Sequence, residues 1–118
     1  MTNGLRLPLR EQAEIPPAKL RDYALNPEHE EGRHKARVFA AALGIRREHW
    51  AYLRDQILRA LESAPVTGVR LAGPWGMLYE VRMDIDGLNG QTHPIITVWF
   101  SRDAIGAPTL TTTYVDVP

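Results

Sequence analysis

The chain contains no cysteine, and this absence excludes several kinds of site at once. Without a thiol among its 118 residues it has no disulfide framework, no thiolate nucleophile and no cysteine-ligated zinc or iron–sulfur centre. Long apolar runs are missing too. The longest, Val38–Leu43, has six residues, whereas a membrane-spanning helix needs about 20. An apolar secretory signal is also absent from the first residues. We therefore expect a cytoplasmic protein with no membrane partner.

An excess of charge of one sign is also lacking. Fourteen Lys and Arg residues balance fourteen Asp and Glu residues, which argues against a strongly basic nucleic-acid clamp and against an acidic mimic. The charge is uneven along the chain, because five basic residues and no acidic one lie between Arg33 and Arg47. A phosphate can be held locally by such a segment, but tight, salt-sensitive binding to long nucleic acid is not expected.

The length and composition indicate a single globular domain over residues 1–118. The apolar fraction of 44% and the charged fraction of 24% are typical of a folded protein, and a chain of this length holds one core. The sequence changes character near residue 64. We expect a helical part over residues 1–63 and an antiparallel sheet over residues 64–118.

Three helices are predicted in the first part. The first begins at Pro16-Pro17, because proline suits the first turn of a helix, and ends before Asn26-Pro27. The second runs from about Arg33 to Leu43, with Gly44 as its C-terminal stop. The third, from about Arg47 to Ser63, has apolar residues at helical spacing: Trp50, Leu53, Ile57 and Leu61.

Three strands are predicted in the second part. Odd positions from Met77 to Ile85 are apolar and even positions are charged from Glu80 onward, which is typical of a half-buried strand. Asn89-Gly90 favours a two-residue type I′ hairpin turn. The strand that follows covers about residues 92–100, and a threonine-rich strand covers residues 109–115. The predicted fold class is α+β, with about three N-terminal helices packed on one face of a three-stranded antiparallel meander.

The open face of this sheet is the first candidate site. If Tyr79, Val81, Met83 and Ile85 face the helices, and Ile96, Val98 and Phe100 do the same on the return strand, one set of side chains remains on the other face. That set contains Glu80, Arg82, His93, Thr97 and Trp99, with two threonine-strand hydroxyls. A carboxylate, an arginine, an imidazole and a stacking aromatic suit metal-free cleavage of RNA. The alternative is an ordinary charged strand face with weak cross-strand pairing.

The segment that joins the first two predicted helices is the second candidate site. His29 and His34 lie there beside Arg33, Lys35 and Arg37. A helix start with free N–H groups and nearby cations can bind a phosphate. Metal binding is disfavoured, because Gly32 interrupts the helical pairing and no HExxH motif is present. No cofactor motif is found either. The alternative here is a solvated helix face with a capping loop.

These residues resemble a family of small bacterial domains of unknown function, which occur alone or at the C-termini of large toxin-like proteins. The resemblance covers roughly residues 7–115. Its main signature is Leu20-x-x-Tyr23-x-Leu25-Asn26-Pro27-x-His29-x-x-Gly32-x-x-Lys35-Ala36-x-x-Phe39, and it continues at Leu43-Gly44, Trp50, Trp75-Gly76-x-x-Tyr79, Asn89-Gly90, Thr97-Val98-Trp99 and Leu110-x-Thr112-x-Tyr114. Two positions depart from the family pattern, Glu30 and Val115, where the family has proline. Such departures fit a divergent or inactive member.

The layout of helices followed by a meander is similar, by fold analogy, to the barnase–EndoU–colicin–RelE ribonucleases. The resemblance implies a metal-independent RNase toxin or effector that cleaves RNA by attack of the 2′-hydroxyl. The candidates that it implies are His29, Lys35, Thr112 and Tyr114. Together with the two candidate sites, the hypothesis assigns catalysis to His29 as acid or base, Lys35 and Arg82 as phosphate and transition-state contacts, and Thr112 and Tyr114 as orienting hydroxyls. Further substrate contacts would come from the two candidate sites: His34, Arg37, Glu80, His93 and Trp99.

The contrasting hypothesis is a non-catalytic interaction module, such as an immunity, antitoxin or accessory protein. The partners implied by the two hypotheses are RNA and a cognate immunity or antitoxin protein. The sequence leaves open whether the His29–Lys35 segment and Arg82 belong to one site.

Overall fold

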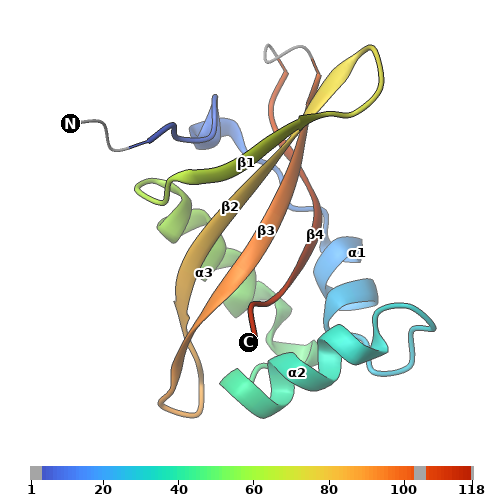
Figure 1. The fold of residues 1–118 in the computed structure, drawn as a ribbon. Helices are drawn as coiled ribbons and strands as arrows, with labels where there is room; N and C mark the ends of the chain where they lie inside the picture. The colour runs from blue at the N-terminus through green and yellow to red at the C-terminus, as the bar shows by residue number, and fades with distance from the viewer. Residues whose placement is uncertain (1–3, 103–105, 118) are drawn as a thin grey trace.

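The computed structural model of the chain describes residues 4–102 and 106–117 as an α+β fold (Figure 1). The elements in chain order are a 3₁₀ turn at Arg10–Gln12, α1 at Pro17–Lys19, a π-helical turn at Leu20–Ala24, α2 at Arg33–Leu43, a 3₁₀ turn at Arg47–His49, α3 at Trp50–Leu61, β1 at Val66–Leu71, β2 at Gly76–Asp86, β3 at Thr92–Arg102 and β4 at Thr109–Val115. The strands form one antiparallel sheet in the order β1-β2-β3-β4.

The helices lie where the sequence signals place them. The bounds predicted for the second helix are those of α2, which ends at Gly44 in the left-handed conformation, with a φ of 66°. The third predicted helix begins as the 3₁₀ turn and continues as α3. The first is a short α-helical segment followed by the π-helical turn, which buries Leu20 and Ala24.

The prediction of a three-stranded sheet is wrong, because β1 adds a fourth strand at the edge beside β2. Most of its residues are exposed: Val69 and Leu71 are both exposed, and Gly68 follows a break in the regular pairing with β2. A strand that buries no complete face has no need of a regular apolar alternation. This is why the sequence pattern did not reveal it.

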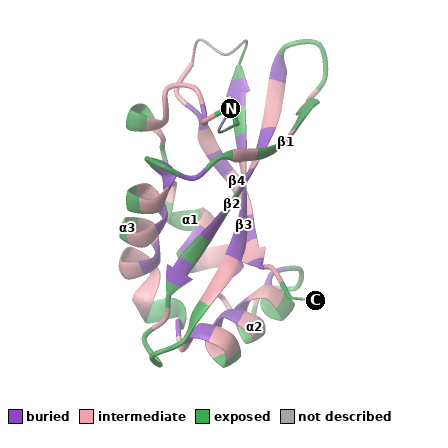
Figure 2. Ribbon diagram, turned by 60° about the vertical axis from the view of Figure 1, so that its left-hand side comes forward, coloured by how far each residue is buried: buried purple, intermediate pink, exposed green. Residues whose placement is uncertain are grey.

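One core unites the helices with one face of the sheet. Odd-numbered positions of β2, from Tyr79 to Ile85, are buried and alternate with exposed or half-buried even positions, as Figure 2 shows along the strand. They share a hydrophobic cluster with residues of α2 and α3: Phe39, Leu43, Leu53, Ile57 and Leu61. The opposite face of β2 and β3, which this cluster does not include, is called the outer face below.

The faces predicted for β3 are wrong, because its register with β2 differs from the predicted one by one residue. Ile85 pairs with His93, Val81 with Thr97 and Tyr79 with Trp99, so odd positions of both strands share the helix-covered face. The hairpin loop explains this register. The N–H of Gly87 donates to the carbonyl of Gln91 at 2.7 Å, and Gly90 has a positive φ of 83° while Asn89 does not. The turn is therefore a three-residue loop rather than the predicted type I′ turn, and one added residue reverses the faces of the following strand.

Trp99 is consequently a core residue and not an open-face aromatic. Its side chain is fully buried, and its Nε1–H donates to Thr97 Oγ1 at 2.8 Å, which in turn donates to the carbonyl of Val81 at 2.9 Å. His93 belongs to the same face, half-buried near the hairpin end and opposite buried Ile85. Neither side chain joins Glu80 and Arg82 on the outer face, so the constellation predicted for that face does not form.

Candidate functional site

A groove of about 550 Å³ lies between the π-helical turn, the loop over residues 26–32 and β4. We call it the His29 groove. It brings together side chains from three separate segments of the chain. The residues that line it are Ala18, Lys19, Asp22, Tyr23, His29, Glu31, Thr111 and Thr112.

His29 organises the loop on one side of this groove. Its Nδ1 accepts hydrogen bonds from the N–H groups of Glu31 and Gly32, both at 3.0 Å, and its carbonyl accepts one from Arg33 N–H at 3.0 Å. A ring nitrogen that accepts two N–H groups carries no proton, so the neutral imidazole has its proton on Nε2. In this arrangement His29 offers a hydrogen-bond donor but no free lone pair. It also occupies the N–H groups just before α2, where a phosphate site was predicted.

Tyr23 packs against the 26–32 loop. Its ring meets that of His29 edge to face, with 4.9 Å between ring centroids. A Cβ at Gly32 would overlap the carbonyl of Tyr23, so this close approach requires glycine. The spacing of Tyr23, His29 and Gly32 in the sequence signature therefore reflects direct contact between these residues.

Lys35 reaches the same place from the first turn of α2. Its Nζ donates to the Tyr23 hydroxyl at 2.7 Å and lies 4.7 Å from the centroid of the ring. Lys35 also lines a second groove, of about 350 Å³, between α2 and β4. That groove contains His34 and Tyr114 as well. The Tyr23–Lys35 pair thus connects the two grooves.

The threonine and tyrosine predicted on the last strand lie at the sheet edge facing these grooves. Thr112 lines both the His29 groove and a groove of about 380 Å³ on the outer face. Its Oγ1 is buried and has no hydrogen-bond partner among the described residues. A buried hydroxyl without a partner is costly. Tyr114 lines two grooves, the one on the outer face and the one between α2 and β4.

The two carboxylates of the His29 groove differ in their surroundings. Hydrogen bonds from Arg21 and Arg47 hold the pKa of Asp22 at about 2, below its usual 3.8. The Arg21 and Arg47 contacts are both 3.0 Å long. Asp22 is therefore a weak base tied into a structural ion pair. The carboxylate of Glu31, by contrast, has no hydrogen bond or ion pair with any described residue.

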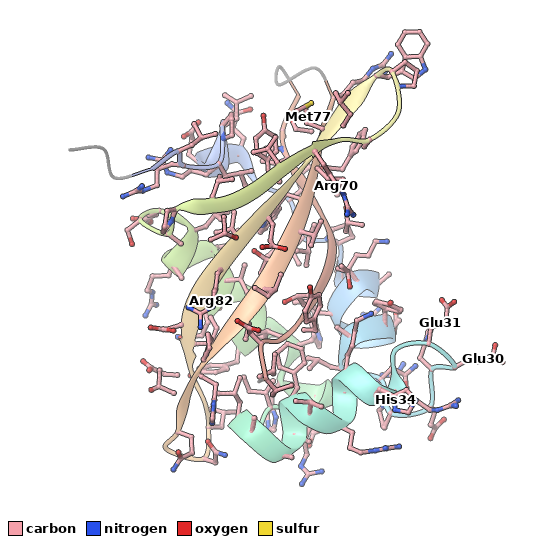
Figure 3. The ribbon with its side chains drawn as sticks, in the orientation of Figure 1. Glu30, Glu31, His34, Arg70, Met77 and Arg82 are labelled. Carbon is pink, nitrogen blue, oxygen red and sulfur yellow. The ribbon has the colours of Figure 1, made fainter. Side chains whose placement is uncertain are left out.

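Arg82 and Glu80 lie apart from this groove. Arg82 is on the outer face, where its Nε donates to Asp116 Oδ2 at 2.8 Å. Ile96 separates it from Tyr114 in the sheet, so two strand spacings, about 10 Å, lie between their backbones. Figure 3 shows Arg82 on β2 and Glu31 and His34 beyond the opposite edge of the sheet. Glu80 accepts a hydrogen bond from Thr67 at 2.9 Å.

The structure therefore brings together part of the predicted site. His29 and Thr112 share one groove, and Lys35 joins them through Tyr23. His34 and Arg37 are exposed on α2, and Arg37 lines a groove on another side of that helix. Tyr23 and Glu31 line the His29 groove although they were not among the predicted site residues. Tyr23 could have been proposed from the sequence, because it is part of the family signature.

The described residues contain no cluster of three or more His, Asp or Glu side chains placed to hold a metal ion. Within the same part of the chain, no helix combines the length and the apolar character needed to cross a membrane.

The family of the chain follows from comparison with known proteins. Searches of curated proteins and of solved structures gave no match. A family model does match, over residues 6–117, and its description is a domain of unknown function, DUF6883. This range contains both the His29 groove and the whole sheet. The chain therefore belongs to the DUF6883 family of domains of unknown function.

Proposed function

We propose that this domain is a metal-independent RNase that cleaves RNA in the His29 groove by attack of the 2′-hydroxyl. The observation that carries the proposal is the convergence of polar groups from three segments. His29, Thr112 and, through Tyr23, Lys35 meet at one groove. Two of these groups offer hydrogen-bond donors to the groove: the Nε2–H of His29 and the Lys35–Tyr23 pair. Such a set suits the anionic oxygens of a phosphodiester.

Glu31 is the general base of this scheme, because its carboxylate is free while Asp22 is held by two arginines. Glu31 takes the proton of the 2′-hydroxyl as that oxygen bonds to phosphorus. The bond from phosphorus to the 5′-oxygen breaks, which gives a 2′,3′-cyclic phosphate. Tyr23 gives its hydroxyl proton to the 5′-oxygen and receives one from Lys35, with which it shares a 2.7 Å hydrogen bond. His29 donates a hydrogen bond through its Nε2–H to a non-bridging oxygen.

The setting of this activity is also part of the proposal. The family resemblance implies a toxin or effector module. A cell that produces such a module would require a cognate immunity or antitoxin protein for protection. Arg82 has no role in the scheme, because it is paired with Asp116 on the outer face. The proposal therefore revises the sequence-based assignment. Tyr23 and Glu31 replace Arg82, His29 becomes a hydrogen-bond donor instead of an acid or base, and Tyr114, which lines other grooves, has no role.

The test is cleavage of a short single-stranded RNA by purified protein, with the cyclic phosphate end measured directly. Tyr23→Phe removes the proton donor but keeps the ring that contacts His29, and Glu31→Gln removes the base at nearly constant size. Each should lower the cleavage rate by about 100-fold or more. Arg59→Ala is the control, because this arginine is exposed at the end of α3 and lines none of the grooves described above. Equal cleavage by the wild type and Tyr23→Phe would refute the proposed chemistry.

A non-catalytic interaction module is the second candidate function. It is favoured by His29, whose Nδ1 is occupied by two backbone N–H groups and so holds the loop together instead of facing a substrate. It is also favoured by the exposed apolar side chains of the β1–β2 hairpin, Val69, Leu71 and Trp75. Growth of bacteria on induced expression separates the two functions. A toxin arrests growth through an intact His29 groove, whereas an interaction module leaves growth unchanged.

A further inference from the structure

Another groove, of about 360 Å³, is lined mainly by positively charged side chains, although the net charge of the chain is zero. We call it the arginine groove. It lies between α2, the start of the 26–32 loop and the segment before α3. Four arginines and one glutamate line it, over a floor of small or apolar residues. The lining residues are Leu25, Pro27, Arg33, Ala36, Arg37, Ala40, Arg46, Arg47 and Glu48.

The local structure explains why the arginines converge. Arg33 and Arg37 are one helical turn apart on α2 and therefore lie on the same face. Ala36 and Ala40 also line the groove, and their small side chains leave space between helix and loop. Arg46 and Arg47 approach from the segment that leads into α3. Arg47 is held in place by hydrogen bonds to the carbonyl of Arg21 and the carboxylate of Asp22.

The charge of this groove is largely uncompensated. Among the described residues Arg33, Arg37 and Arg46 form no ion pair, and all three are exposed. Glu48 is the one acidic side chain in the lining. Cations held near one another repel, and an anion placed between them relieves that repulsion. Guanidinium groups also match phosphate oxygens in geometry, through paired N–H donors.

We infer that the arginine groove binds the phosphodiester backbone of the RNA strand beside the cleavage point. This inference rests on the proposed function, because it extends the substrate of the His29 groove. The two grooves adjoin at one ion pair: Asp22 lines the His29 groove, Arg47 lines the arginine groove, and their side chains are 3.0 Å apart. A strand that passes over this pair contacts both grooves. The aromatic surface of Trp50, beside Arg21 and Arg54, is adjacent to the same ion pair.

The test measures binding without cleavage. A fluorescent 2′-O-methyl oligoribonucleotide, which lacks the attacking hydroxyl, is titrated with protein at several salt concentrations, and anisotropy gives the Kd. The Arg37→Ala/Arg46→Ala double variant should raise the Kd at least tenfold at low salt. Loss of two contacts to a single strand should also reduce the slope of log K against log salt by about 1.4. Arg59→Ala removes the same kind of charge on α3 and should leave the Kd within about twofold of wild type.

The outcomes separate this inference from the proposed function. If the wild type binds the oligonucleotide and the double variant does not, the arginine groove is a site for the RNA backbone; absence of cleavage would then count against the proposed function alone. If the double variant binds as tightly as the wild type, the inference is wrong even where cleavage is observed. Weakening by Arg59→Ala as large as that by the double variant would also overturn it, because binding would then follow net charge rather than the groove. Thermal unfolding of each variant confirms that the fold is retained.

Discussion

His29 holds a loop together through its own side chain. Its Nδ1 accepts two backbone N–H groups just before α2, as a capping side chain does at a helix start. His29→Ala should therefore reduce the free energy of unfolding by about 1 kcal/mol. His29→Asn, whose amide oxygen can accept the same bonds, should lose less. Urea unfolding of the two variants measures the difference, and equal stability of His29→Ala and wild type would contradict the capping role.

Two glycines make a matched pair for testing packing against backbone strain. Gly32→Ala should cost about 2 kcal/mol or more, because its Cβ would overlap the carbonyl of Tyr23. Gly90→Ala should cost about 1 kcal/mol, since Gly90 has a φ of 83° but open space around it. Thermal unfolding of both variants gives the order. A Gly32→Ala variant more stable than Gly90→Ala would be inconsistent with the contact between the loop and Tyr23.

Only some residues of the His29 groove could be proposed from the sequence. His29, Lys35 and Thr112 stand in the family signature, which made them candidates; in the structure His29 and Thr112 line one groove, and Lys35 is hydrogen-bonded to Tyr23 of that groove. Glu31 was not predictable. It is one of several acidic residues in a polar loop, and only the folded chain turns it toward the groove. Arg82 lies on the outer face, where the alternation of the strand predicts it, but the fold separates it from the His29 groove, and its side chain is paired with Asp116.

At the scale of elements, the helix bounds and β4 were predictable, and the orientation of β3 was not. Capping and stop signals are local, so Gly44 fixed the end of α2 from the sequence alone. The face of β3 depends on whether the hairpin loop has two residues or three. Asn89-Gly90 favours two, but the loop also takes in Leu88, whose N–H donates to the carbonyl of Leu43 at 2.7 Å. A contact with α2 therefore accompanies the longer loop, and strand propensity cannot show such a contact.

The buried state of Trp99 gives a direct check on that orientation. In a Trp50→Phe/Trp75→Phe variant, Trp99 is the remaining tryptophan. Because its ring is fully buried and its N–H is bonded to Thr97, its fluorescence should be blue-shifted and protected from acrylamide. The emission should shift to the red on unfolding in urea. Quenching in the folded state as strong as in the unfolded state would place Trp99 on the open face instead.

For the whole molecule, the Asp22 ion pairs join the first helical segment to the segment before α3. The pKa of Asp22 is lowered from 3.8 to about 2 by Arg21 and Arg47. A carboxylate with a lowered pKa stabilises the fold above its unfolded pKa, and this contribution is lost as the pH falls through the folded value. Wild type should therefore exceed Asp22→Asn in stability at neutral pH, and the difference should narrow between about pH 4 and pH 2. Urea unfolding across this range is the measurement; a constant difference would contradict the assignment.

The net charge of the whole molecule says little about binding, because it does not show where charged side chains gather on the surface. The balance of fourteen basic and fourteen acidic residues conceals the arginine groove. The sequence does show the run without acidic residues from Arg33 to Arg47. It does not show that a groove lies between the two ends of this run, because that depends on how the 26–32 loop, α2 and the segment before α3 pack against one another.

The central claim is that the His29 groove cleaves RNA through the 2′-hydroxyl. The most direct test uses one end-labelled oligonucleotide in two forms, all-ribose and all-2′-deoxy, incubated with the wild type in the presence of EDTA. Only the ribose form should be cleaved, with 2′,3′-cyclic phosphate ends, and Tyr23→Phe should lose that cleavage. An intact ribose oligonucleotide at high protein concentration, or equal cleavage of both forms, would contradict the claim.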